Sequence, residues 1–220
     1  IVGKERNLLK NYPKAKRDLS ARLEQKTQED RGIARKFGQE FFDGERKHGY
    51  GGFEYNPRFW QPVIPTFREY WNLSSQSKVL DIGCGKGFMM HDLYESIPGI
   101  DVRGIDISSY AISNCIDTVK DKVLVADAKE LPFDDNSFDV VISINTIHNL
   151  IENDCAIAVK EIERVSKKYS FITVDAYRNE AEKERMYAWN LTAKTIMSVE
   201  EWIKFFSDND YSGDYYWFIQ

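Results

Sequence analysis

The sequence predicts an α/β protein with a doubly wound, mostly parallel sheet, preceded by an N-terminal helical and aromatic cap. Three observations lead to this prediction. From residue 78 onward, short β-rich runs alternate with amphipathic helical stretches, which is the pattern of right-handed βαβ crossovers. Residues 1–73 lack this alternation and read as helices followed by a loop rich in glycine and aromatic residues. Apolar residues make up 42% of the 220 positions, which suffices for a substantial core.

The N-terminal helical region is expected at residues 14–47. Its apolar residues recur at every fourth position, as at Leu19 and Leu23, on a background of charged side chains. Gly32 is expected to divide this region into two helices, because glycine weakens a helix interior.

The loop at residues 48–65 is dense in glycine, proline and aromatic side chains. Its glycines permit hinge-like backbone geometry and its aromatic rings could cover a ligand, so we predict a lid. The alternative, which the sequence leaves open, is that these rings pack as ordinary core. A short helix at 63–72 and a polar run at 74–77 lead into the main domain. We therefore expect a boundary between residues 1–73 and 74–220.

The elements of the main domain follow from residue types and periodicity. β-branched and aromatic residues predict the strands, and apolar residues at helical spacing predict the helices. The expected strands are 79–82, 102–107, 123–126, 138–144, 171–174 and 215–219, and the expected helices are 87–97, 108–120, 151–168, 180–193 and 198–207.

The distribution of charge narrows the possible partners. The formal net charge is −5, and residues 1–48 carry 13 Lys and Arg against 8 Asp and Glu, so the remainder is acidic. Charges of both signs are interspersed in the front segment, and the acidic remainder would repel phosphate groups. Nucleic acid is therefore not the expected partner.

The cysteines and the apolar runs indicate the setting of the protein. Cys84, Cys115 and Cys155 form neither a CxxC pair nor a disulfide framework, so we expect no metal site and a reducing, cytoplasmic location. No run of about 18 to 20 apolar residues is present, and the first residues lack the apolar core of a signal peptide. No membrane segment is expected, and the oligomeric state is left open.

A glycine-rich turn, from Asp81 through Gly83 and Gly85, follows the first expected strand. Glycines at this point allow a tight turn and bring the backbone close to a ligand at the next helix N-terminus. The dinucleotide-binding fingerprint would need a small residue where this chain has Phe88, and a phosphate-binding P-loop would need a Gly-Lys-Ser/Thr ending. The turn therefore follows a different pattern, Asp-x-Gly-x-Gly-x-Gly.

Two further acids lie just after expected strands. Asp106 ends the second strand, 25 residues after Asp81, where a carboxylate can accept two hydrogen bonds from a ribose diol. Its alternative role is the N-cap of the next helix. Asp127 lies just past the third strand and could accept a hydrogen bond from an exocyclic adenine amine, or it could simply be a turn residue.

With these motifs in order, the chain resembles the class I S-adenosylmethionine-dependent methyltransferases, in particular their small-molecule branch, over about residues 70–207. The matching segments are 79–88, 104–108, 126–133 and 137–143. The resemblance implies a Rossmann-like methyltransferase fold, S-adenosyl-L-methionine as cofactor and S-adenosyl-L-homocysteine as product. It implies cofactor contacts from Asp81, Gly83, Cys84, Gly85, Asp106, Ile107, Asp127, Ala128 and Asn145. The C-terminal part departs from the family, because no final antiparallel hairpin is visible.

The acceptor side is expected beyond the fourth and fifth strands. His148 lies past a strand's carboxyl end, where open α/β sheets bind ligands, and is the best candidate for a general base. A packing or hydrogen-bonding role is its alternative. Arg178 suits an acceptor that carries a carboxylate or phosphate, although it could equally be a surface charge at a helix start. The candidate acceptor contacts are Tyr50, Trp60, His148, Asp175, Tyr177 and Arg178.

The function implied by the resemblance is methyl transfer from S-adenosylmethionine to oxygen, nitrogen or carbon of a small metabolite. Such a cofactor is intrinsically reactive, so the protein mainly aligns the reactants and excludes water. Three alternatives stay open: a methyltransferase that acts on a protein or RNA, a cofactor-binding protein without methyl transfer, and the same fold performing other chemistry.

Overall fold

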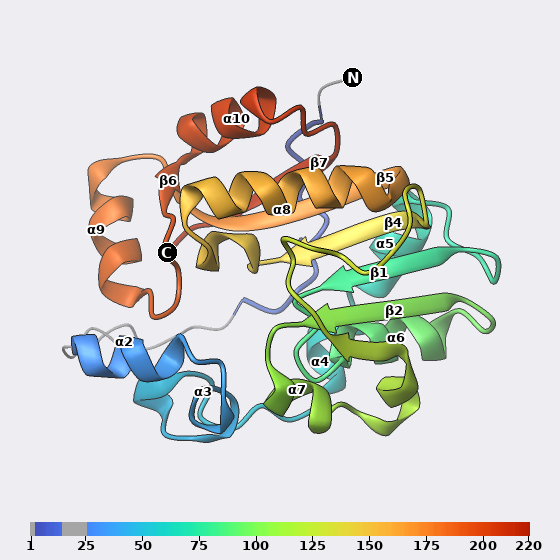
Figure 1. Ribbon diagram of the computed structural model, residues 1–220, viewed down its shortest axis with the longest axis horizontal. Helices are drawn as coiled ribbons and strands as arrows, with labels where there is room; N and C mark the ends of the chain where they lie inside the picture. Colours follow the sequence, from blue (N-terminus) through green and yellow to red (C-terminus); the bar gives the residue numbers. More distant parts are fainter. Residues whose placement is uncertain (1–2, 15–25) are drawn as a thin grey trace.

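The computed structural model describes residues 3–14 and 26–220, so the expected helical spacing at Leu19 and Leu23 lies outside the described residues. Its seven strands form one sheet in the order β3-β2-β1-β4-β5, with β6 and β7 both pairing with β5 (Figure 1). The strands are β1 (Lys78–Ile82), β2 (Asp101–Asp106), β3 (Val123–Val125), β4 (Phe138–Ile144), β5 (Ser166–Tyr177), β6 (Met197–Ser198) and β7 (Asp214–Phe218). The predicted doubly wound α/β fold is confirmed.

The last strand, β7, is not part of a final antiparallel hairpin, which is the pattern of the family that the sequence resembles. It lies beside β5 and runs parallel to it, with Phe171 opposite Asp214 and Asp175 opposite Phe218. The other strand pairings in the sheet are parallel as well. The described residues therefore form no final antiparallel hairpin, in agreement with the sequence pattern.

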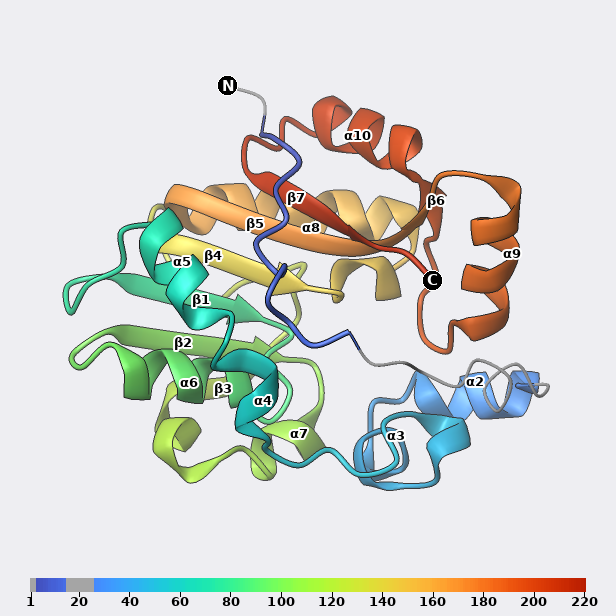
Figure 2. The same ribbon diagram turned by 180° about the vertical axis from the view of Figure 1, so that it is seen from behind.

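Helices cover both faces of the sheet. The α-helices are α2 (Gln28–Ala34), α3 (Gln39–Asp43), α4 (Pro57–Trp60), α5 (Ile64–Tyr70), α6 (Phe88–Ser96), α7 (Ser109–Ser113), α8 (Glu152–Val165), α9 (Glu180–Trp189) and α10 (Val199–Asp208), and the 3-10 helices are η1 (Arg46–His48), η2 (Asp117–Lys122) and η3 (Ile147–Asn149). Figures 1 and 2 show α8 and α10 on one face and α5 on the other.

Each face of the sheet has its own core. On one face, Phe67 of α5 and Leu93 of α6 are fully buried against β1, β2 and β4. On the opposite face, Val159 of α8 and Trp202 of α10 are fully buried against the same sheet. Burial of side chains this large is the main favourable term that fixes the layers, at about 25 cal/mol per Å² of apolar surface.

Two helix predictions were wrong. Gly32 lies inside α2 and does not break it, because a Thr27–Asp30 capping box starts that helix and its glycine faces open space. The expected helix at 108–120 stops at Ser113 and resumes as η2. The break occurs because the Ile116 N–H donates to the Lys86 carbonyl, 2.9 Å away, which draws the chain to the glycine loop.

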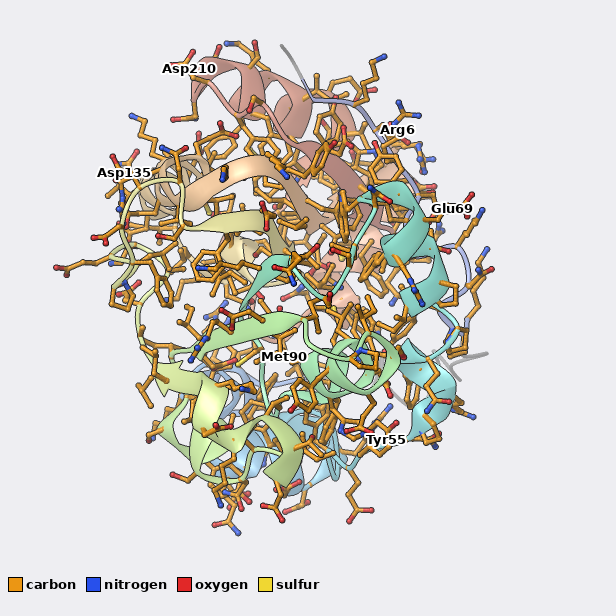
Figure 3. The ribbon with its side chains drawn as sticks, turned by 90° about the vertical axis from the view of Figure 1, so that its right-hand side faces the viewer. Arg6, Tyr55, Glu69, Met90, Asp135 and Asp210 are labelled. Carbon is orange, nitrogen blue, oxygen red and sulfur yellow. The ribbon has the colours of Figure 1, made fainter. Side chains whose placement is uncertain are left out.

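The N-terminal segment at residues 3–14 lies along the edge of the sheet. The Arg6 N–H donates to the Tyr215 carbonyl at 2.9 Å, and the Tyr215 N–H donates to the Lys4 carbonyl at 3.2 Å. Leu8 is buried in the same core as α5 and α6. Figure 2 shows the segment passing in front of β7, and Figure 3 shows Arg6 and Glu69 of α5 on one side of the molecule.

Residues 26–56, here named the cap, carry α2, α3 and η1. Figures 1 and 2 agree in placing α2 beside α9 and α3 beside α7, at one end of the sheet. That end is the carboxyl end of β1, β2 and β4, because all three strands run parallel toward it. The cap therefore lies over the edge where open α/β sheets bind ligands.

Candidate cofactor and acceptor site

The glycine loop, residues 83–87, turns sharply between β1 and α6. Gly83, Gly85 and Gly87 have φ angles of 80°, 55° and 79°, which is the left-handed region that favours glycine. The Gly83 and Cys84 N–H groups both donate to the Ile105 carbonyl, at 2.8 and 3.0 Å. A Cβ atom on Gly83 would lie only 2.1 Å from the Thr146 hydroxyl oxygen. The loop is thus pressed against neighbouring side chains and needs its glycines.

Asp106, at the end of β2, holds this loop in place. One carboxylate oxygen accepts from the Gly85 N–H and the other from the Ser108 N–H, each at 2.8 Å. Burial raises the pKa of Asp106, and these backbone hydrogen bonds act in the opposite direction. Each oxygen keeps a further lone pair, so the carboxylate can still accept from a diol. The cap role proposed as the alternative falls instead to the Ser108 side chain, which accepts from the Ala111 N–H.

Asp81, at the end of β1, is only 5% exposed. Burial first, and then the charge of neighbouring Asp106, raise the pKa of Asp81 to about 8, and no described residue offers it a compensating hydrogen bond. A buried carboxyl in this state is stabilised as a carboxylate when a cation binds beside it. S-adenosylmethionine carries a sulfonium and an ammonium group, so the charge of this site fits the cofactor.

The remaining predicted cofactor residues lie along the same edge. Ile107 exposes 56% of its surface, which leaves an apolar side chain beside Asp106. Asp127 accepts from the Lys129 N–H at 2.9 Å, with Ala128 half-buried next to it. Asn145 has a φ of 50°, and its side-chain oxygen accepts from the Thr173 hydroxyl at 2.9 Å. The structure therefore brings the ends of β1, β2, β3 and β4 to one edge of the sheet, and the contact of these residues with the cofactor stays a prediction.

The cap contacts the glycine loop directly. The Lys86 ammonium, in the middle of the loop, forms an ion pair with Asp43 of α3 at 2.7 Å. The Phe53 ring lies 3.3 Å from the position that a Gly85 Cβ would occupy. Tyr50, predicted to contact the acceptor, packs against Phe53 with ring centroids 4.3 Å apart. This part of the predicted lid thus lies at the cofactor loop.

His148 of η3 is buried, with 3% of its surface exposed, and both ring nitrogens face Asp175. Nδ1 accepts from the Asp175 N–H at 2.9 Å, and Nε2 lies 3.7 Å from a carboxylate oxygen of Asp175. Burial lowers the pKa of His148, although the charge of Asp175 opposes this. The neutral ring therefore uses its acceptor nitrogen on the backbone. The prediction that His148 is a general base stays a prediction, and such a role requires this hydrogen bond to open.

A chain of hydrogen bonds extends from this pair to the segment after α9. The Asn190 amide donates to the Asp175 carboxylate, and its oxygen accepts from the Ala193 N–H at 2.7 Å. The Lys194 and Thr195 N–H groups both donate to the His148 carbonyl at 3.0 Å. The ends of β4 and β5 thereby hold residues 190–195 in one conformation.

The cap also reaches the end of α9 and the segment that follows it, through three cations. Arg35 donates to the Ala193 carbonyl at 3.3 Å, and Arg31 donates to the Tyr187 carbonyl at 3.4 Å. Lys26 donates to the Trp189 carbonyl near the end of α9, where main-chain carbonyls lack helical partners. The cap therefore bridges the glycine loop and residues 187–193 across the carboxyl edge of the sheet.

Three predicted acceptor residues make other contacts. Trp60 is half-buried and packs on Tyr12, with ring centroids 5.0 Å apart. Tyr177 is half-buried with Lys183 over its ring, and Arg178 is exposed, 4.0 Å from Glu5. That these three residues contact an acceptor stays a prediction.

The sequence reasoning missed Asp43, Lys86 and Asn190. Lys86 carried a usable signal, because a lysine between two glycines of a tight turn is held in a defined position. Asp43 and Asn190 carried none, because each acts on a residue distant in the chain, 43 positions away for Asp43 and 15 for Asn190.

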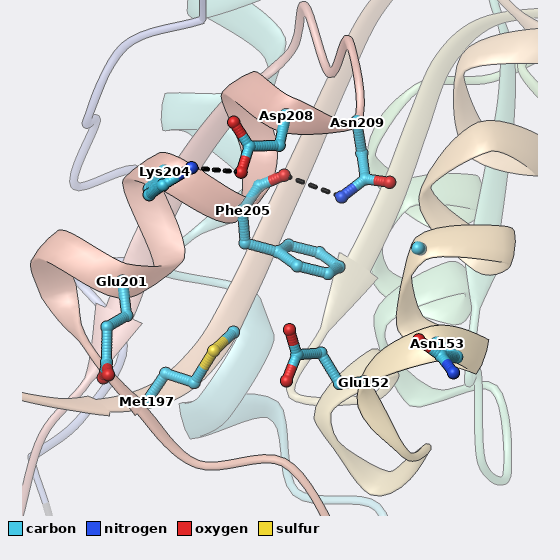
Figure 4. A pocket seen from close by; sticks show the side chains of 9 residues that line it. Glu152, Asn153, Met197, Glu201, Lys204, Phe205, Asp208 and Asn209 are labelled. Atoms are coloured by element: carbon cyan, nitrogen blue, oxygen red, sulfur yellow. Dashed lines mark hydrogen bonds and ion pairs between the residues drawn. The ribbon is translucent and has the colours of Figure 1, made fainter.

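One hollow of about 390 Å³ lies elsewhere, between α8 and α10 (Figure 4). Its lining includes Glu152, Glu201 and an Asp208 that pairs with Lys204 at 2.5 Å. None of the residues singled out from the sequence lines it. Within residues 3–14 and 26–220, no cluster of His, Cys, Asp and Glu has the arrangement of a metal site. None of the helices in these ranges has both the length and the apolar character that a membrane span requires.

Comparisons with known proteins agree with this geometry. A family model described as a methyltransferase domain matches residues 80–174. A tRNA (carboxymethyluridine(34)-5-O)-methyltransferase of Arabidopsis thaliana is 36% identical over 147 residues, which cover 64% of this chain and 33% of that protein. The alignments span between 25% and 39% of the curated relatives' own length.

Solved structures share the fold. A methyltransferase of Haloferax volcanii, in complex with a methyltransferase activator, is 27% identical with a TM-score of 0.52, over 62% of this chain and 61% of that chain. A protein of Methanosarcina mazei described as a SAM-dependent methyltransferase is 23% identical with a TM-score of 0.53, over 66% of this chain and 83% of that chain. Residues 80–174 therefore match the methyltransferase family, and the cofactor that this match implies is S-adenosylmethionine.

Proposed function

We propose that this protein transfers the methyl group of S-adenosylmethionine to a small-molecule acceptor held beneath the cap. The observation that carries the proposal is the bridge that the cap forms between the glycine loop and residues 187–193. Arg35 and the Asp43–Lys86 pair attach it at its two ends. A reaction edge covered from both sides favours an acceptor small enough to be enclosed.

The charges of the cap support a small acceptor over a nucleic acid. Lys26, Arg31 and Arg35 belong to the basic front segment, and each donates to a main-chain carbonyl of residues 187–193. Cations used in this way contribute little to phosphate binding. The formal net charge of −5 acts in the same direction.

The residues on the cofactor side and those on the acceptor side would have different roles. When bound, S-adenosylmethionine would supply an activated methyl group, and the protein would align the nucleophile with it. Asp81 and Asp106 would bind the cofactor through charge and hydrogen bonds, and the cap would exclude water. His148 and Asp175 would orient residues 190–195 against the acceptor, and His148 would take a proton only where the acceptor carries one.

The similarity to a tRNA methyltransferase favours RNA as a second candidate acceptor. Salt dependence separates the two. A protein that makes six to ten phosphate contacts loses about 10³- to 10⁵-fold in affinity between 50 and 200 mM salt. A small acceptor bound beneath the cap should show a change of about threefold or less over that range.

The test is a search for the acceptor. The protein is incubated with S-adenosylmethionine and either a metabolite extract or total tRNA, and release of S-adenosylhomocysteine is measured at both salt concentrations. Release with the extract that is insensitive to salt supports the proposal. Release of S-adenosylhomocysteine with tRNA alone would contradict the proposal of a small-molecule acceptor. Cofactor binding without release in either case would indicate a binding protein.

We further propose a cytoplasmic, reducing setting. The support is that Cys84, Cys115 and Cys155 are all buried free thiols. Localisation of a tagged full-length protein by microscopy would test this, and recovery from an oxidising compartment would contradict it.

A further inference from the structure

Asp43 of the cap collects hydrogen bonds from three other segments. Both of its carboxylate oxygens accept from the Lys86 ammonium, at 2.8 and 2.7 Å. One oxygen also accepts from the Phe53 N–H at 3.0 Å, and the other from the Tyr110 hydroxyl at 2.6 Å. A single carboxylate thus joins α3, the chain at Phe53, the glycine loop and α7.

Lys86 is the more buried partner of this ion pair. Its side chain is 9% exposed, against 26% for Asp43, and its ammonium also donates to the Phe53 carbonyl at 2.9 Å. Although burial acts to raise it, the hydrogen bonds from Lys86, Phe53 and Tyr110 hold the pKa of Asp43 at about 2. The Asp43 carboxyl is therefore ionised at neutral pH.

The cap touches both residues that flank the Asp106 carboxylate. Gly85 donates its N–H to one Asp106 oxygen and lies under the Phe53 ring. Ser108 donates its N–H to the other Asp106 oxygen, and its hydroxyl donates to the Phe37 carbonyl. A ligand held by Asp106 and the glycine loop therefore lies next to cap residues on both sides.

We propose that the Asp43–Lys86 ion pair holds the cap closed over the cofactor, so that both are positioning residues for S-adenosylmethionine binding. The proposal rests on the cofactor assigned above and concerns how this chain retains it. If only the closed cap binds tightly, the apparent dissociation constant equals the intrinsic one divided by the closed fraction. Weakening the pair lowers that fraction and so weakens binding.

Substitutions of the two partners should not weaken binding equally. Asp43→Asn leaves the Lys86 ammonium buried with one main-chain carbonyl, and an unpaired buried charge is costly. Lys86→Met leaves a more exposed carboxylate that keeps its hydrogen bonds from Phe53 and Tyr110. Asp43→Asn should therefore weaken binding more, and Lys86→Met should repair part of that loss when the two are combined.

The experiment measures the affinity of S-adenosylhomocysteine by calorimetry for the wild type, both single variants and the double variant. We expect Asp43→Asn to bind about tenfold or more weakly and Lys86→Met about threefold, with the double variant close to Lys86→Met. The control is Lys47→Met, which removes an exposed ion pair with Glu45 in the same cap and should leave affinity unchanged.

A second measurement separates closure of the cap from general stability. Amide exchange at residues 37–55 should slow when S-adenosylhomocysteine is added to the wild type, and should slow less in Asp43→Asn. Ligand-free melting temperatures identify a variant that is merely unfolded, and Lys86→Met then carries the test because it leaves no buried charge unpaired.

The outcomes are distinct. Normal affinity in all three variants, or losses in the double variant equal to the product of the single losses, would overturn the role of this ion pair and leave the cofactor assignment intact. Failure of the wild type itself to bind S-adenosylhomocysteine would overturn both.

Discussion

The two halves of the site are built in different ways. In the cofactor half, the glycine loop and Asp106 are held by main-chain N–H groups of Gly85, Ser108 and their neighbours. In the acceptor half, the side chains of His148, Asp175 and Asn190 lie together, and the chain at 190–195 is held by the Asn190 side chain and by the His148 carbonyl. The first arrangement depends on where strands end, and the second depends on which side chains meet.

This difference separates the half of the site that many chains could form from the half that requires this chain's own residues. Any chain with the same strand ends and glycines can build the cofactor half, because backbone groups are identical along a chain. The acceptor half needs the specific residues that this chain brings together. It is therefore the half expected to determine which acceptor is methylated.

The largest expected effect tests the cofactor half. Asp106→Ala removes a carboxylate that holds two loop N–H groups and is placed to accept from a ribose, so S-adenosylhomocysteine should bind roughly 10- to 150-fold more weakly. Calorimetry measures the change. Asp101→Ala, at the opposite end of β2 in an exposed pair with Arg103, is the matched control. Affinity retained in Asp106→Ala would reduce Asp106 to a residue that only shapes the turn.

The acceptor half is tested at His148. His148→Ala should lower the maximal rate by up to about 10²-fold, because misplacing a positioning group has that cost, while cofactor affinity stays near normal. His148→Asn retains an acceptor for the Asp175 N–H, so its rate should stay within about tenfold of the wild type. Equal losses of about 10²- to 10⁴-fold in both variants would instead establish a general base.

The pH dependence of ligand affinity tests the charge of Asp81 in the cofactor half. Because the pKa of Asp81 is raised to about 8, the carboxyl is protonated in the ligand-free protein at pH 6 and must lose its proton when a cationic ligand binds beside it. Affinity for S-adenosylhomocysteine should therefore rise about tenfold from pH 6 to pH 7.

The raised pKa of Asp81 also affects the stability of the ligand-free protein. This stability should fall as the pH rises, whereas the affinity for the ligand should increase. Asp81 ionises near pH 4 when the chain is unfolded and near pH 8 when it is folded, so this group favours the folded state at low pH. Its contribution to the ligand-free free energy of unfolding falls as the pH rises from about 4 to about 8. Asp81→Asn should flatten both profiles, and an unchanged pH dependence in that variant would assign the proton to another group.

The smallest expected effect concerns the contact between the cap and the acceptor half. Arg35→Ala removes the hydrogen bond to the Ala193 carbonyl and should raise the Michaelis constant for the acceptor about threefold to fivefold. The affinity for S-adenosylhomocysteine should not change. Lys36→Ala, an exposed neighbour, is the control. A loss of cofactor affinity in Arg35→Ala alone would mean that the two ends of the cap are not independent.

The order of strands and helices from residue 78 onward could be predicted from the sequence, because each strand and helix is a local pattern of apolar residues. The glycine turn and the acids at Asp81, Asp106 and Asp127 could be located for the same reason. Their environment could not, because the raised pKa of Asp81 arises from burial and from a second acid 25 residues away.

Periodicity and strand ends are local patterns of neighbouring residues, so the sequence alone predicts a parallel α/β sheet and the edge at which a cofactor is expected. Tertiary structure alone decided the pairing of Asp43 with Lys86, the parallel placement of β7 beside β5, and the burial of His148 against Asp175. Each of these joins segments from 27 to 43 residues apart in the chain, and no local pattern specifies such a meeting. The physical reason is that side-chain hydrogen bonds and packing are chosen by the whole folded chain, after local propensity has set its elements.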